Sequence, residues 1–88
     1  MQRIRETAIK LREYFERHEA EQPGRWARNV EVSREWCRLV ELEAPPEADV
    51  RQLLSDLQAP DAHQGTAWYE LGTWVRKWAA EHVPLVSD

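Results

Sequence analysis

The sequence predicts an all-α fold, a compact four-helix bundle. Apolar residues recur at alternating intervals of three and four positions, a spacing that places them on one face of an α-helix. Segments with proline or glycine divide the chain into four such stretches. With only 88 residues, the chain has room for one core. We therefore expect a single helical domain over residues 1–88, with short connections between antiparallel neighbours.

The first helix is expected at residues 2–22. Its apolar stripe runs from Ile4 to Phe15, and the segment Gln22-Pro23-Gly24 then ends it, because proline clashes with a preceding helical turn. Two pairs of opposite charge at i,i+4 spacing are expected to stabilise this helix: Glu6–Lys10 and Glu13–Arg17.

The second helix is expected at residues 25–43, where two adjacent apolar stripes form a wide arc. Residues 29–33 alternate strictly between polar and apolar, so a short strand is the alternative there. A lone strand would leave its backbone groups unpaired, which favours the helix. Asn29 is an alternative N-cap for a helix that begins later.

The third helix is expected at residues 46–58, because proline is favoured in a first turn and acidic residues follow it. The fourth is expected at residues 66–82. Asp61 and Gln64 have the spacing of a capping box, and Thr66 is the competing start of this helix.

Composition excludes several classes of protein. No apolar run approaches the roughly 20 residues of a membrane-spanning helix, and a single cysteine forms no internal disulfide. Residues 1–43 hold nine basic and nine acidic groups, and residues 44–88 hold three and seven. We expect no direct contact with nucleic acid and no membrane partner. The charged start of the chain lacks a secretory signal pattern, so we expect a cytoplasmic protein.

The histidines, the cysteine and the glycines lack the spacings that are typical of metal, catalytic and phosphate-binding sites. No two of His18, His63 and His82 lie three or four positions apart, and Cys37 lies on an apolar face. The three glycines are isolated, so there is no phosphate-binding loop. We therefore expect that the protein is not an enzyme and binds neither a metal ion nor a cofactor.

Five tryptophans are the unusual feature of the sequence. Trp68 and Trp78 lie centrally in an apolar stripe and are expected in the core. Tryptophan and tyrosine dominate protein-binding surfaces. Four apolar residues lie off their helix's main stripe and are the candidate contacts to a protein partner or a second copy of the chain: Ile9, Trp36, Tyr69 and Trp74. The sequence thus favours a non-enzymatic protein–protein interaction module.

Two alternatives remain open. One is an acidic inhibitor of the type made by phages and plasmids, which blocks a nucleic-acid-binding surface on its target. Its patch would be formed by Glu47, Asp49, Asp56 and Asp61. The other is a small ligand- or metal-binding bundle with a pocket bounded by Cys37, Trp78 and His82.

Overall fold

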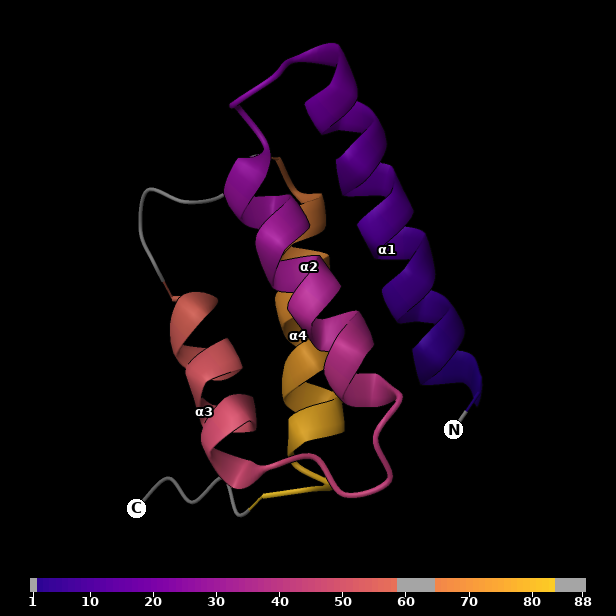
Figure 1. The fold of residues 1–88 in the computed structure, drawn as a ribbon, viewed down its shortest axis with the longest axis vertical. Coiled ribbons are helices and arrows are strands. Elements are labelled where there is room, and N and C mark those ends of the chain that lie inside the picture. The colour runs from indigo at the N-terminus through magenta and orange to yellow at the C-terminus, as the bar shows by residue number, and fades with distance from the viewer. Residues whose placement is uncertain (1, 59–64, 84–88) are drawn as a thin grey trace.

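The structure, a computed structural model, describes residues 2–58 and 65–83. These residues form an all-α four-helix bundle and contain no strand (Figure 1). The helices are α1 (Gln2–Glu21), α2 (Ala27–Val40), α3 (Glu47–Asp56) and α4 (Ala67–Ala79). Every boundary lies within three residues of the one expected from the sequence.

Two local alternatives are resolved by α2. Residues 29–33 are helical, so the strand interpretation is wrong, and Asn29 lies inside the helix rather than at its N-cap. Thr66 directly precedes α4 but makes no side-chain capping hydrogen bond. The capping box expected at Asp61 and Gln64 lies outside the described residues.

The four helices run alternately up and down, so α2 and α4 are parallel to each other (Figure 1). The two parallel helices lie between α1 and α3, and each of these outer helices packs against both. The interface of α1 with α2 is the most extensive, whereas α1 and α4 contact each other less. The bundle is consequently flat, with principal extents of 37 × 29 × 19 Å.

The core is formed by the apolar stripes that define the helices. Burial of their side chains is the main favourable contribution to folding. The largest fully buried apolar side chains come from all four helices: Phe15, Val32, Trp36, Leu39, Val50, Leu53, Leu71 and Val75. Trp36 packs against Trp78 with 6.4 Å between ring centroids. Trp68 and Trp78 are buried as expected.

The turn between α1 and α2 is held by a side chain from α1. Glu19 accepts hydrogen bonds from the backbone N–H of Gly24 at 2.6 Å and of Trp26 at 2.7 Å. Gly24 has φ +90°, a conformation that favours glycine. The Trp26 indole stacks on the His18 ring, with 4.6 Å between centroids. The chain therefore reverses direction within five residues after α1.

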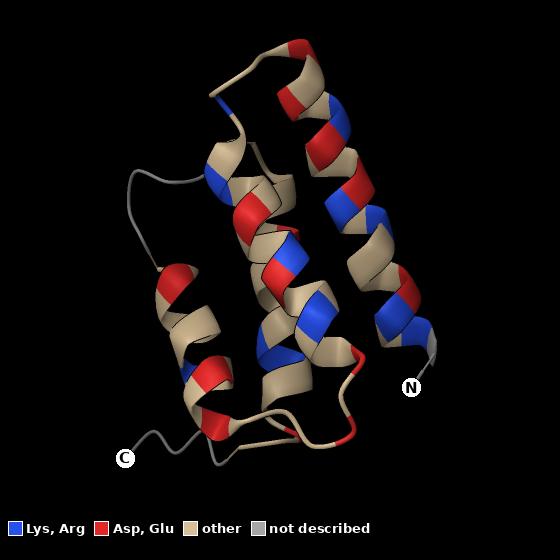
Figure 2. Ribbon diagram, in the orientation of Figure 1, with Lys and Arg blue, Asp and Glu red and all other residues tan. Residues whose placement is uncertain are grey.

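Ion pairs connect the exposed sides of the first three helices. Arg34 of α2 pairs with Glu16 of α1 at 2.8 Å, and Arg38 of α2 pairs with Asp49 of α3 at 3.2 Å. Figure 2 shows acidic and basic residues alternating along α1 and α2. Among the described residues, neither of the i,i+4 pairs expected within α1, Glu6–Lys10 and Glu13–Arg17, approaches within 4.0 Å, so that expectation is wrong.

Candidate functional site

An open groove of about 500 Å³ lies between α1 and α4. It exists because these two helices contact each other less than α1 contacts α2. Its floor and walls combine aromatic, aliphatic and charged side chains. The lining residues are Thr7, Lys10, Leu11, Tyr14, Thr66, Ala67, Glu70 and Trp74.

Trp74 and Tyr14 are the two aromatic residues of the groove. Trp74 is half-buried against the core, and Tyr14 is 39% exposed. The ammonium group of Lys77 lies 5.4 Å from the centroid of the Trp74 ring, within the range of a cation–π interaction. The groove therefore presents aromatic surface that the bundle itself leaves uncovered.

The four partner-binding candidates do not form one surface. Trp74 lies in the groove, and Tyr69 is 64% exposed as expected for a surface residue. Five positions separate Tyr69 from Trp74, so they lie about 140° apart around α4. Ile9 is half-buried and does not line the groove.

Trp36 contradicts the prediction that it is available to a partner. It is 0% exposed and belongs to the core. The reason is the position of α2, which packs against α1, α3 and α4 and so buries a wide apolar arc. No acceptor among the described residues pairs with its indole N–H.

Sequence reasoning missed Tyr14, which is the second aromatic of the groove. The signal was present in the spacing: Thr7, Leu11 and Tyr14 follow each other at four and three positions along one flank of α1. This flank lies beside the stronger apolar stripe that ends at Phe15, and that stripe dominates the periodicity of the helix.

The predicted acidic patch is brought together only in part. Asp49 and Asp56 line a small pocket, of about 270 Å³, between α2 and α3, together with Glu31 and Glu35, whereas Glu47 does not line it. Basic residues neutralise most of these carboxylates. Arg38 pairs with Asp49 and Glu35, Arg28 pairs with Glu31, and Arg51 pairs with Glu47. Asp61 lies outside the described residues.

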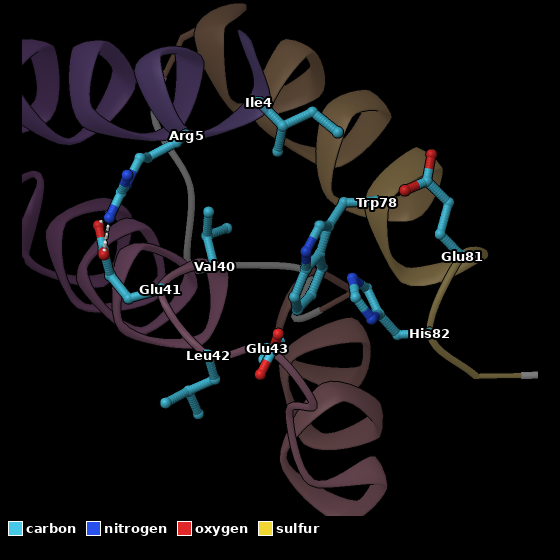
Figure 3. A pocket seen from close by; sticks show the side chains of 9 residues that line it. All are labelled: Ile4, Arg5, Val40, Glu41, Leu42, Glu43, Trp78, Glu81 and His82. Atoms are coloured by element: carbon cyan, nitrogen blue, oxygen red, sulfur yellow. Dashed lines mark hydrogen bonds and ion pairs between the residues drawn. The ribbon is translucent and has the colours of Figure 1, made fainter. Parts of the chain in front are cut away.

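A second open pocket, of about 590 Å³, lies at the end of the bundle where α1 begins and α2 and α4 end (Figure 3). Trp78 and His82 lie on one side of it, with 5.1 Å between their rings. Arg5 and Glu41 face each other on the other side in a two-bond ion pair. The hydrogen bonds from Arg5 lower the pKa of Glu41 below its ordinary value.

This second pocket differs from the one expected for a ligand- or metal-binding bundle. Trp78 and His82 line it, but Cys37 does not. Burial raises the pKa of the Cys37 thiol, although the neighbouring Arg12 opposes this effect, so the thiolate is disfavoured at neutral pH. Within residues 2–58 and 65–83, no three His, Cys, Asp or Glu side chains are grouped to hold a metal ion.

Comparisons of the chain with protein-family models, with curated proteins and with solved structures found no match. In the part of the chain that the structure describes, no helix combines the length and hydrophobicity needed to cross a bilayer.

Proposed function

We propose that this chain is a small, non-enzymatic interaction module that binds a partner protein through the groove between α1 and α4. The observation that carries this proposal is that the half-buried Trp74 and the exposed Tyr14 line one hollow between two helices. Tryptophan and tyrosine contribute large contact areas at a low cost in side-chain entropy, and they are enriched among the residues that dominate binding energies.

The composition of the groove supports a macromolecular partner rather than a small molecule. Small-molecule sites enclose most of their ligand. This groove is open along the side of the bundle, and charged residues form part of each wall. A polar rim around an apolar centre is the usual anatomy of a protein–protein interface.

The acidic inhibitor draws less support. An exposed acidic patch that imitates nucleic acid requires carboxylates without neighbouring cations. Glu47 and Asp49 instead each pair with an arginine of the same chain. We therefore favour the groove over the acidic face as the functional surface.

Photocrosslinking tests the proposal with two matched positions. Thr7 and Thr73 each donate a hydroxyl hydrogen bond to the carbonyl four residues earlier, at 2.9 and 3.0 Å. Thr7 lines the groove, whereas Thr73 is exposed and does not. A benzophenone amino acid is placed at each position, and the proteins are irradiated in extracts of the native cells. We expect a discrete protein adduct from position 7 that is absent from position 73.

Trp74→Ala in the position-7 probe is expected to abolish that adduct while the helical circular dichroism is retained. An adduct with twice the mass of the chain would identify a second copy as the partner. Adducts that are the same at both positions, or that persist without Trp74, would contradict the proposal.

A further inference from the structure

We propose that the segment held by the groove is an amphipathic helix that carries acidic residues along the flank facing α1. This inference rests on the proposed function, because it concerns the same groove. Two observations carry it: the shape of the hollow between two helices, and the distribution of unpaired basic residues along one of its edges.

The shape favours a helical occupant over an extended one. The backbone groups of α1 and α4 are hydrogen-bonded within their own helices, so the groove offers no row of free N–H and C=O groups to an added strand. A helical segment satisfies its own backbone and contributes only side chains. The lining residues run from Thr7 to Tyr14 on α1 and from Thr66 to Trp74 on α4, about 12 Å along the helix axes. A partner helix of about 14 residues covers this length and extends about one turn beyond each end.

Basic residues follow one edge of the groove along α1. Arg3, Lys10 and Arg17 recur every seven positions, a spacing that drifts by only about 20° per repeat around a helix. They therefore form one stripe about 21 Å long on α1. Lys10 lines the groove, and Arg3 and Arg17 lie about one turn beyond its two ends. We call these three residues the basic stripe.

The basic stripe is not neutralised within the part of the chain that the structure describes. No carboxylate there lies within 4.0 Å of the charged groups of Arg3, Lys10 or Arg17. Six other arginines are engaged in ion pairs on α1, α2 and α3: Arg5, Arg12, Arg28, Arg34, Arg38 and Arg51. The free cationic groups of α1 are thus Lys10, which lines the groove, and Arg3 and Arg17, which lie about one turn beyond its ends.

Acidic residues of the protein also lie near the groove, so the prediction of acidic partner residues concerns only the flank of the partner helix that faces α1. Glu6 and Glu13 lie about 40° beyond Lys10 and Arg17 around α1, on the side away from the groove, so a docked helix meets the basic stripe first. On the opposite wall, Glu70 lines the groove and Lys77 lies over Trp74. The α4 edge is therefore mixed in charge, and complementarity selects carboxylates only on the flank that faces α1.

Two synthetic peptides test this inference. Both form an amphipathic helix of about 14 residues with the same leucine-rich apolar face. One carries glutamate and the other lysine at two positions, seven residues apart, on one flank. Binding is measured by fluorescence anisotropy of the labelled peptide at low salt, and we expect the acidic peptide to bind at least about tenfold more tightly.

A matched pair of variants locates the effect. Lys10→Glu/Arg17→Glu reverses two charges of the basic stripe, and we expect it to lower the affinity for the acidic peptide by about tenfold or more. Arg25→Glu/Arg76→Glu makes the same change in net charge at exposed positions that do not line the groove, and should leave affinity within about twofold. Circular dichroism checks that both double variants are folded.

The outcomes separate the two proposals. Equal affinity for both peptides, or tighter binding of the basic one, overturns the inference about charge and leaves the groove as an interaction site. Failure of both peptides to bind overturns the helical occupant, while the position-7 adduct still tests the proposed function. A dimer in sedimentation that Trp74→Ala dissociates also overturns the inference, because a second copy would occupy the groove.

Discussion

The carboxylate of Glu19 accepts a hydrogen bond from the backbone N–H of Trp26, the residue that directly precedes α2. A second bond, from Gly24, occupies its other oxygen. One side chain at the end of α1 therefore fixes both the reversal of the chain and the start of the next helix. Trp26 is held at the same time by its stack on His18.

Removing the Glu19 carboxylate is expected to destabilise the bundle. Capping interactions of this kind contribute about 1–2 kcal/mol, so Glu19→Ala should lower the free energy of unfolding by that amount in urea denaturation. Glu19→Gln keeps only one strong acceptor, so its free energy of unfolding should lie between those of Glu19→Ala and the unsubstituted protein. Glu21→Ala, an exposed position two residues later, is the control and should change stability by less than about 0.5 kcal/mol. Equal losses at the two positions would show that Glu19 does not hold the turn.

Trp36 is expected to respond very differently to two substitutions. Trp36→Ala leaves a large cavity in the core and should cost about 3–5 kcal/mol. Trp36→Phe leaves a smaller cavity and also removes a buried N–H that lacks an acceptor among the described residues. These effects oppose each other, so we expect a loss of about 1 kcal/mol or less. Urea unfolding measures both, and similar losses would contradict this account of the indole N–H.

The contrast between Trp36 and Trp74 shows what periodicity can predict. Both residues lie at the margin of their helix's apolar face, so the sequence pattern predicts both as contacts to a partner. Both helices contact the other three, but α2 has the most extensive interface, with α1, whereas the flank of α4 that bears Trp74 meets the loosely packed side of α1. Trp36 is therefore in the core, while Trp74 lines the groove. The existence and type of the four helices followed from spacing, but how closely the neighbouring helices pack against each face is a property of the assembled bundle.

The candidate site was predictable to the same limited degree. Trp74 was identified from the sequence, whereas Tyr14 became a candidate only when α4 was placed beside α1.

The ion pairs of α1 were also predictable only in part. The spacing of Glu6 and Lys10 allowed an intrahelical pair, but spacing specifies only that two side chains are neighbours, and the rotamers they adopt leave Lys10 at the groove.

The ion pair of Arg5 with Glu41 is expected to make stability depend on pH in the acidic range. Arg5 lowers the pKa of Glu41 below its ordinary value of 4.5 in the folded protein. The pair therefore stabilises the fold fully above about pH 4.5, and this contribution is lost as the pH falls through the folded pKa. Arg5→Gln should lower stability at neutral pH, and the difference from the unsubstituted protein should shrink at pH 3.

Carbon-13 NMR titration of the Glu41 carboxyl group measures the same effect directly. The pKa should rise towards 4.5 in Arg5→Gln. Arg28→Gln removes an equal charge near the opposite end of α2 and should leave the Glu41 titration unchanged. A Glu41 pKa that is identical with and without Arg5 would contradict the assignment.

Two glycines with positive φ are expected to differ in their tolerance of a side chain. Gly24 has φ +90° with no atom within 4 Å of the site of a Cβ, whereas at Gly65, with φ +74°, a Cβ would lie 3.3 Å from the Trp26 ring. Alanine at position 24 meets only backbone strain, about 1 kcal/mol, while alanine at position 65 must also displace the indole that stacks on His18. Gly65→Ala should therefore lower the free energy of unfolding in urea more than Gly24→Ala does.

Asparagine separates the two causes, because it tolerates positive φ but retains a Cβ. Gly24→Asn should recover most of the stability lost in Gly24→Ala, and Gly65→Asn should not recover the stability lost in Gly65→Ala. Full recovery at both positions would show that Trp26 does not restrict position 65.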